Sequence, residues 1–262
     1  MADNTGMERL LDIMSQLRNP EGGCPWDLKQ TFETILPHTL EEAYEVADAI
    51  ESGDRDQLRD ELGDLLFQVV FYSQLGKEEG SFQFADISNA MADKLLRRHP
   101  HVFGDLNAKD GDEALANWEA IKQTERTAKQ QHSVLDDIPK ALPGMQRAAK
   151  IQKRAANVGF DWPEVAPVFD KLDEEVAEIH EAYASGDREH VLDELGDLMF
   201  MCVNLARHMK ANPEQVMRAA NEKFERRFRL MEAQLEADGL VIGEQSIDDL
   251  EAAWQKAKIG VR

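Results

Sequence analysis

A pattern of four carboxylates occurs twice in this chain, and no other feature of the sequence has a clearer chemical meaning. The first copy comprises Glu42, Glu45, Glu61 and Asp64, and the second comprises Glu175, Glu178, Glu194 and Asp197. A constant shift of 133 residues superimposes the two copies, and it also places one Ser-Gly-Asp segment on another. The chain is therefore predicted to contain an internal duplication.

The spacing within each copy predicts a helical hairpin. Glu45 and Glu61 lie eight residues either side of Gly53, and the second copy has the same symmetry around Gly186. If each Ser-Gly-Asp segment forms a tight turn between antiparallel helices, the paired carboxylates stand level across the hairpin. Carboxylates three residues apart also share one helix face. Four carboxylates then converge, and a hard divalent cation would relieve the repulsion between them.

The ligand types indicate which cation this would be. Asp and Glu without neighbouring His or Cys favour Mg²⁺, with Mn²⁺ as a substitute. Acidic pairs three residues apart are also common on solvated helices, so one pair alone would be weak evidence. The pairs matched across a turn, and repeated in both halves, favour the metal site. Because Mg²⁺ commonly shares its coordination with substrate phosphates, we expect a phosphate-bearing substrate.

Basic residues suited to phosphate follow each carboxylate set. They are Lys94, Arg97 and Arg98 in the first half, and Lys223, Arg226 and Arg227 in the second. Because Lys223 and Arg227 are four residues apart, they share a helix face and could bind one polyphosphate. The alternative is that these cations only offset acidic neighbours such as Glu222 and Glu225.

Further residues are candidates for contact with the substrate. Lys171 precedes Glu175 by one helical turn, and His190 precedes Glu194 by one turn. Two Trp-x-x-x-Lys segments end the halves, and either tryptophan could stack on a base or simply pack against a helix. Asp27 and Asp161, in corresponding loops, could bind a base or cap helices. The candidate substrate-binding set of the second half is Lys171, His190, Asp193, Lys223, Arg226, Arg227, Trp254 and Lys258.

Composition excludes several classes of protein. Of 262 residues, 30 are Lys or Arg and 51 are Asp or Glu, which gives a formal charge of −21. This excess of negative charge disfavours binding to nucleic-acid polymers and to anionic membranes. The two cysteines stand in dissimilar contexts, and the N-terminus lacks the apolar stretch of a signal peptide. We expect a cytoplasmic protein without a disulfide framework.

Helical periodicity dominates the chain. It predicts helices over residues 40–50, 58–74, 87–98, 112–130, 145–156, 215–235 and 247–258, with a second hairpin over 168–208. We therefore expect an all-α protein of two tandem helical bundles, with an N-terminal domain over 1–130, a linker over 131–143 and a C-terminal domain over 144–262. The helix over 58–74 is apolar on most sides, which favours burial in a bundle or at a subunit interface. A homodimer is the simplest symmetric assembly.

These motifs together resemble a known family. Glu-Glu-x-x-Glu at 41–45 and 174–178, each followed by Glu-Leu-Gly-Asp, resembles the MazG nucleoside triphosphate pyrophosphohydrolases of the all-α NTP pyrophosphatases. The similarity extends to Gly-Cys-Pro-Trp-Asp, Arg-Arg-His-Pro-His-Val-Phe and Asn-Glu-Lys-Phe-Glu-Arg-Arg-Phe. The resemblance implies a homodimer of tandem helical domains. It also implies Mg²⁺-dependent cleavage of NTPs and dNTPs between the α- and β-phosphates, to the monophosphate and pyrophosphate, with broad base specificity.

The resemblance assigns roles to individual residues. It implies that all eight carboxylates are metal ligands, that Lys223 and Arg227 bind phosphate, and that Trp254 lies on the base side. Glu175, Glu178, Glu194 and Asp197 form the candidate catalytic set. Glu178 is the candidate to orient or deprotonate the attacking water. The first half departs from the pattern where Pro100 ends its fourth helix, so we expect less activity there.

Two alternatives to broad hydrolysis stay open at this point. One is a nucleotide-sensing module that binds Mg²⁺-nucleotide without turnover and acts through a regulatory protein partner. The other is a house-cleaning enzyme for one deoxynucleotide or a modified nucleotide. Base selection depends on the shape of the pocket, which spacing along a sequence does not determine.

Overall fold

The protein is all-α, as the periodicity predicts. The computed structural model describes residues 5–106, 108–128 and 133–260, and no strand occurs within these ranges. The chain forms two compact units, Met1–Ala128 and Lys129–Arg262. In the described ranges, no helix has the length and apolar character needed to cross a membrane. The domain limits at 130, 131–143 and 144 stay predictions, and residues 129–132 lie outside the described part.

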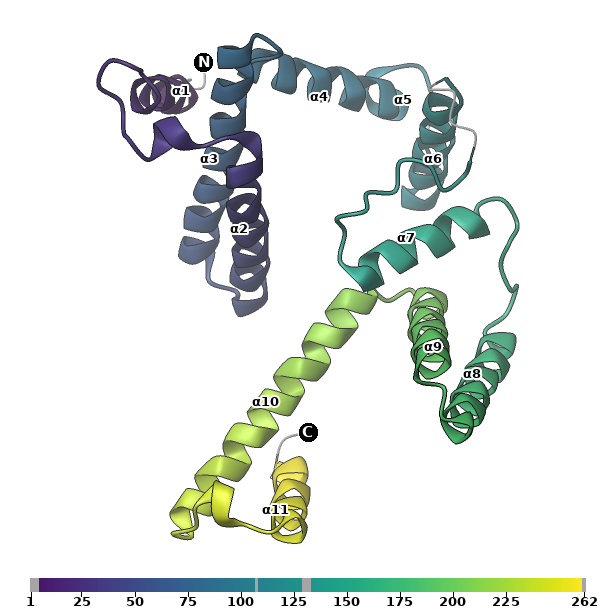
Figure 1. Ribbon diagram of the computed structural model, residues 1–262. Coiled ribbons are helices and arrows are strands. Elements are labelled where there is room, and N and C mark those ends of the chain that lie inside the picture. Colours follow the sequence, from purple (N-terminus) through teal and green to yellow (C-terminus); the bar gives the residue numbers. More distant parts are fainter. Residues whose placement is uncertain (1–4, 107, 129–132, 261–262) are drawn as a thin grey trace. The chain divides into compact units, whose positions relative to one another are not determined.

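The first unit is built around the hairpin of α2 and α3 (Figure 1). Its elements are α1 (Thr5–Leu17), the 3-10 turn η1 (Asp27–Lys29), α2 (Phe32–Ser52), α3 (Arg55–Glu79), α4 (Phe84–Arg98), α5 (Pro100–Phe103) and α6 (Gly111–Ala128). The predicted end of the fourth helix is confirmed, because α4 stops at Arg98 and Pro100 starts the short α5. Proline suits a helix start since its missing N–H is not needed there.

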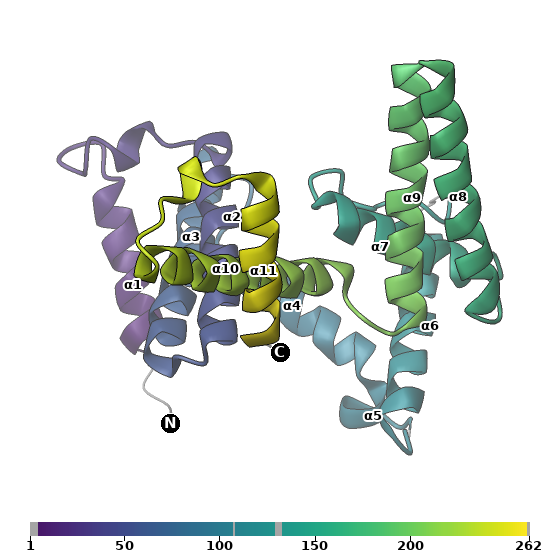
Figure 2. The same cartoon turned by 90° about the horizontal axis from the view of Figure 1, so that it is seen from below.

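The second unit repeats the hairpin with α8 and α9, which lie side by side in both Figure 1 and Figure 2. Its elements are α7 (Gly144–Ala156), α8 (Ala166–Ser185), α9 (Arg188–His208), α10 (Pro213–Ala237), the 3-10 turn η2 (Ile242–Glu244) and α11 (Ile247–Gly260). α10 packs against α11. Each unit therefore presents one long antiparallel hairpin with further helices at its end.

The two hairpin turns have the same local chemistry. Gly53 and Gly186 each adopt a φ of 77°, in the left-handed region that favours glycine. The following aspartate caps the next helix in both turns. Asp54 accepts from the N–H groups of the second and third residues after it, and Asp187 does the same. The predicted Ser-Gly-Asp turn is confirmed in both halves.

One apolar cluster holds α1, α2 and α3 together. It consists of Met14, Ile35, Val70, Phe71 and Leu75. Complete burial of a side chain of this size contributes about 1.5–3 kcal/mol, so this cluster anchors the base of the first hairpin. The other end of α3 is different, because Leu62 is 49% exposed and Leu66 is 36% exposed. Within one chain, the apolar surface of α3 is therefore covered over only part of its length.

Candidate active site

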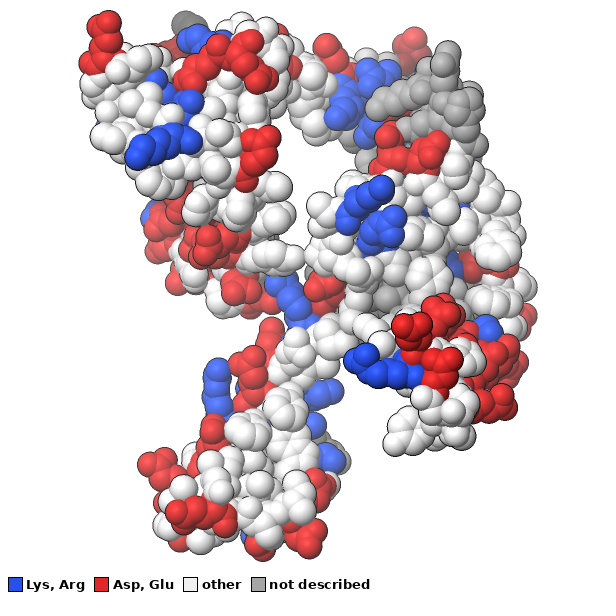
Figure 3. Space-filling model, in the orientation of Figure 1, with Lys and Arg blue, Asp and Glu red and all other residues white. Residues whose placement is uncertain are grey.

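The second hairpin brings three carboxylates together across its two helices. Glu175 projects from α8, and Glu194 and Asp197 project from α9. One oxygen of each lies within 4.8 Å of the others. Glu175 is buried at 4% exposure, whereas Asp197 stays exposed. Acidic side chains gather over this hairpin and over the α2–α3 hairpin on the face drawn in Figure 3.

Glu178, the fourth predicted ligand, lies outside this group of three. Its side chain is 42% exposed and lies 3.9 Å from the Nζ of Lys171. Partial loss of hydration raises the pKa of Glu178 above its ordinary value, Lys171 opposes this rise, and Glu194 adds to it. Glu178 is therefore a partly exposed carboxylate beside the group of three but separate from it.

Lys171 is an ammonium group built into the second cluster. Its Nζ lies 2.8 Å from Glu174, 3.0 Å from Glu175 and 3.9 Å from Glu178. Hydrogen bonds with Glu174 and Glu175 raise the pKa of Lys171, so the group stays charged at neutral pH. The spacing of one helical turn between Lys171 and Glu175 therefore places the ammonium group directly against the buried carboxylate.

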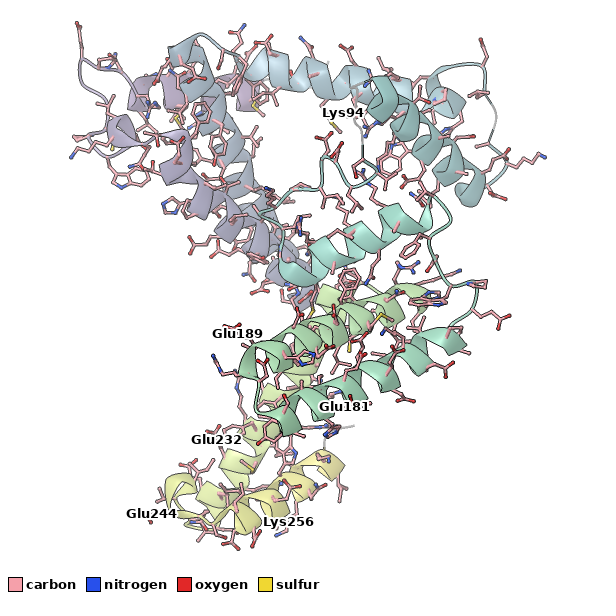
Figure 4. All side chains as sticks on the ribbon, turned by 45° about the vertical axis from the view of Figure 1, so that its right-hand side comes forward. Lys94, Glu181, Glu189, Glu232, Glu244 and Lys256 are labelled. Carbon is pink, nitrogen blue, oxygen red and sulfur yellow. The ribbon has the colours of Figure 1, made fainter. Side chains whose placement is uncertain are left out.

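His190 and Asp193 lie at the start of α9, beside the same cluster. The Nε2 of His190 is 2.9 Å from an oxygen of Glu194. His190 and Asp193 also line a shallow, open depression of the surface together with Glu189 and Leu192. Figure 4 labels Glu181 and Glu189, which lie on α8 and α9 towards the turn. His190 thus contacts a carboxylate of the cluster, and Asp193 lies on the same helix.

The predicted phosphate-binding cations lie on a different helix, α10. Arg226 is exposed and pairs with Glu222 at 3.6 Å, as the charge-offset alternative predicts. Lys223 is exposed as well. The ion pairs described for the carboxylates of α8 and α9 involve Lys171 and His190 of the same hairpin, and not Lys223 or Arg226. Binding of phosphate by Lys223, Arg226 and Arg227 of α10 stays a prediction.

Trp254 packs against α10 within the second unit. Its ring centroid lies 5.0 Å from that of Phe224, and the two planes meet at 44°. It also borders a buried cluster whose members are Met231, Leu235, Ala253 and Ala257. Lys258, one turn further along α11, is exposed. Packing therefore accounts for the position of Trp254, and a role in stacking on a base stays a prediction.

Asp161, the loop residue considered for base recognition, is engaged within the chain. Its carboxylate accepts hydrogen bonds from Arg207 and lies 3.3 Å from His208. Arg207 lowers the pKa of Asp161 below its ordinary value. Its counterpart Asp27 is buried at 7% exposure where η1 begins. The loop before α8 is thereby tied to the end of α9.

The first hairpin holds a second group of three carboxylates. Glu42 and Glu45 of α2 and Glu61 of α3 each place one oxygen within 4.8 Å of the others. Asp64 lies outside this group but is close enough to affect it. Burial raises the pKa of Glu42, and the negative charges of Asp64 and Glu45 raise it further. The Nε2 of Gln68 donates to Glu42 at 3.3 Å.

Two of the three predicted cations of the first half, Arg97 and Arg98, pair with a carboxylate of α6. Arg97 donates to an oxygen of Glu125 at 2.7 Å, and Arg98 donates to the other oxygen at 2.5 Å. These bonds, from Arg98 first and then Arg97, lower the pKa of Glu125 to about 2. Trp118 lies beside them, with the guanidinium of Arg98 5.8 Å from its ring centroid. Lys94, labelled in Figure 4, precedes the pair on α4.

Sequence reasoning missed Gln68 and Glu125. Both had a usable signal. Gln68 follows Asp64 by four residues and Glu61 by seven, so it shares the carboxylate face of α3. Glu125 follows Trp118 by seven residues on α6. Neither residue has an identical counterpart at the equivalent position of the other half. The sequence argument relied on residues that are identical in the two halves, so it did not identify Gln68 or Glu125.

Comparisons with known proteins place the chain in a family. The model of the MazG nucleotide pyrophosphohydrolase domain matches residues 30–103, and that of phosphoribosyl-ATP pyrophosphohydrolase matches residues 146–224. The nucleoside triphosphate pyrophosphohydrolase of Escherichia coli (strain K12) is 56% identical over 254 residues, covering 96% of this chain and 97% of that protein. The chain belongs to the MazG family.

Other relatives agree with membership of the MazG family. Nucleoside triphosphate pyrophosphohydrolase/pyrophosphatase MazG of Thermotoga maritima is 42% identical, covering 97% of this chain and 96% of that protein. YabN of Bacillus subtilis is 41% identical, covering 94% of this chain and 50% of that longer protein. The two matched segments contain one carboxylate hairpin each, so both halves of this MazG-family chain resemble pyrophosphohydrolases.

Proposed function

We propose that this chain is a Mg²⁺-dependent nucleoside triphosphate pyrophosphohydrolase. It cleaves NTPs and dNTPs between the α- and β-phosphates, with broad base specificity, and releases the monophosphate and pyrophosphate. The main support is the group of Glu175, Glu194 and Asp197, whose oxygens lie within 4.8 Å of one another on facing helices. The names of the relatives from Escherichia coli and Thermotoga maritima describe the same class of reaction.

The residues present fit a hard divalent cation. All three donors are carboxylate oxygens, and their mutual distances suit one ion between them. Glu175 is buried, and burial of a carboxylate among other carboxylates is costly without a counter-charge. Glu175, Glu194 and Asp197 would hold Mg²⁺, or Mn²⁺ in its place, with Glu178 at the edge. When bound, the ion supplies neutralisation of the negative charge on the triphosphate.

The chain's own residues would then carry the chemistry. Glu178 orients water and takes its proton as the water oxygen attacks the α-phosphorus, and the bond to the bridging oxygen breaks as pyrophosphate leaves. Its position outside the group of three supports this role, because a ligand fully engaged with metal is a poor base. Lys171 stays charged beside Glu178 and stabilises the orientation of its carboxylate. His190 and Asp193 would contact the substrate from the start of α9.

Substrate binding beyond the carboxylates is assigned to α10 and α11. Lys223, Arg226 and Arg227 would stabilise the departing pyrophosphate, since cations at developing negative charge lower the barrier. Trp254 and Lys258 would lie on the base side. A tryptophan contact tolerates any base because every base offers a π-face, which supports broad specificity.

We further propose that the enzyme is a cytoplasmic homodimer. Apolar side chains are exposed along both hairpins, among them Leu62 and Leu66 in the first and Val176, Leu192 and Met199 in the second. Such surfaces on a single chain commonly mark an interface. The two cysteines, Cys24 and Cys202, are both free, which suits a reducing compartment.

The test is product analysis with matched variants. The purified chain is incubated with a panel of NTPs and dNTPs, with and without Mg²⁺, and the products are separated by ion-exchange chromatography. We expect monophosphate and pyrophosphate in equal amounts, and only with metal. Glu175→Gln should remove most of this activity and Glu42→Gln less. Orthophosphate as the sole product would contradict the proposed cleavage, and equal losses in the two variants would contradict the lower activity expected of the first half.

A further inference from the structure

The two hairpins carry the same four carboxylates but place different neighbours beside them. The shift of 133 residues that aligns the carboxylates also aligns His38 with Lys171 and Gln68 with Met201. His38 and Lys171 precede Glu42 and Glu175 by four residues on α2 and α8, and Gln68 and Met201 follow Asp64 and Asp197 by four residues on α3 and α9. Each cluster is therefore surrounded by a different combination of charge and polarity.

The second cluster contains its own positive charge, whereas the described residues place no Lys or Arg against the first. Lys171 lies 3.0 Å from Glu175 and 3.9 Å from Glu178. In the first hairpin, His38 faces another way. Its Nδ1 is 3.7 Å from Glu41, and its ring lies edge-on to Trp26 at 6.2 Å. Among the described ion pairs of the first unit, none joins a Lys or Arg to the carboxylates of the first cluster.

The first cluster has a buried amide where the second has a thioether. Gln68 is only 5% exposed, and its side-chain nitrogen is directed at Glu42. Its side-chain oxygen is buried and has no hydrogen-bond partner. A buried oxygen without a partner is unusual, and an ion or a water molecule carried by an ion would satisfy it. Met201, 6% exposed, offers only a weak sulfur acceptor.

The geometry points to two different uses of the two clusters. The first cluster, formed by Glu42, Glu45 and Glu61 with Gln68, is a resident divalent-cation site that fills without nucleotide. The second cluster, partly neutralised by Lys171, takes its metal together with the phosphates of the substrate. The statement about the first cluster stands on its own, and the statement about the second rests on the proposed function.

The physical reason is competition for the same carboxylates. A metal ion entering the second cluster must displace the ammonium group of Lys171 from Glu175, and substrate phosphates would then give that ammonium a new partner. An ion entering the first cluster displaces no cation. It would also join α2 to α3, so the resident ion would stabilise the first hairpin.

Binding of Mn²⁺ to the metal-stripped full-length chain, without nucleotide, tests this inference. Electron paramagnetic resonance counts bound Mn²⁺, and calorimetry gives its affinity. We expect one tight Mn²⁺ per chain, retained in Glu175→Gln and lost in Glu42→Gln, two variants that remove a charge with little change in volume. Gln68→Met should weaken this binding about 10-fold, the scale of a lost outer contact to a metal site, and the matched Met201→Gln should leave it unchanged.

A second pair of variants tests the role of the built-in cation. His38→Lys places an ammonium group at the position equivalent to Lys171 and should weaken nucleotide-free Mn²⁺ binding by 10-fold or more. His38→Gln, which adds no charge, is the control and should bind as the unmodified chain does. Equal binding by His38→Lys and His38→Gln would contradict the role of competing charge.

Several outcomes would overturn the inference. These are Mn²⁺ binding that survives Glu42→Gln, binding that disappears in Glu175→Gln, two ions of equal affinity, or no binding at millimolar Mn²⁺. Failure of the proposed hydrolysis is detected separately, as absence of pyrophosphate release by the Mg²⁺-loaded chain. The binding result for the first cluster keeps its meaning in either case, because no turnover is measured in it.

Discussion

Replacing Glu42 by glutamine should make the metal-free protein more stable. At least two pairs of like charges are removed, because Glu42 lies within 4.8 Å of both Glu45 and Glu61, and Asp64 adds to the repulsion. At that distance each pair repels by about 1 kcal/mol at the dielectric constant of water and about 3.5 kcal/mol at an effective value of 20. Glu45 is exposed, so the lower figure applies, about 2 kcal/mol for both pairs. The weakened hydrogen bond from Gln68 costs about 1 kcal/mol of this.

The expected net gain is about 1 kcal/mol, or roughly 4 °C in the melting temperature of a unit of this size. Glu175→Gln is the matched comparison. It removes similar repulsion from Glu194 and Asp197, but it also removes an attraction to Lys171 at 3.0 Å. That attraction is about 1.4 kcal/mol at the dielectric constant of water, so we expect little or no gain from Glu175→Gln.

Thermal denaturation followed by circular dichroism measures both variants, first in EDTA at low salt. Excess Mg²⁺ should then make Glu42→Gln less stable than the unmodified chain. An ion present at 100 times its dissociation constant adds about 2.7 kcal/mol to the unmodified chain, and the variant should gain far less. High salt should shrink the difference seen in EDTA, because it screens the repulsion. A Glu42→Gln protein less stable than the unmodified chain in EDTA would refute this reasoning.

Three further predictions concern the active site and the ion pair on α6. Asp197→Asn should lower kcat about 100-fold or more in the pyrophosphate-release assay, since it removes a ligand on the exposed side of the cluster. Lys171→Met should increase the affinity for Mn²⁺ in the absence of nucleotide while lowering kcat, and a parallel loss of both would count against its role as a displaceable cation. Glu125 has a folded pKa of about 2, below its ordinary value of 4.5, so its pairing with Arg98 and Arg97 contributes stability above pH 4.5 that is lost as the pH falls towards 2. Glu125→Gln should therefore lower the free energy of unfolding by about 1–2 kcal/mol at pH 7, a figure discounted for the exposure of Arg97, and by almost nothing near pH 2. Urea unfolding at the two pH values measures the difference. A cost that does not change with pH would show that the ion pair is not its source.

The fold and the convergence of the carboxylates were accessible from the sequence for a local reason. Helix periodicity and the Ser-Gly-Asp turn are properties of neighbouring residues, and both turns adopt the expected left-handed glycine. Once a turn is fixed, residues at equal distances from it must lie level across the hairpin. The spacing around Gly53 and Gly186 therefore carried three-dimensional information. The spacing did not separate the three clustered carboxylates of each hairpin from the fourth, which is Glu178 in one hairpin and Asp64 in the other.

The sequence by itself determined the duplication, the all-α class and the paired carboxylates of each hairpin, because each follows from residue type and local spacing. The tertiary structure decided which charges meet. It placed Lys171 against Glu175, Arg98 against Glu125 and Trp254 against Phe224. Such contacts depend on the rotation of each helix about its axis and on rotamers chosen by packing. These are set by the whole unit, so two copies with the same carboxylates can have different neighbours.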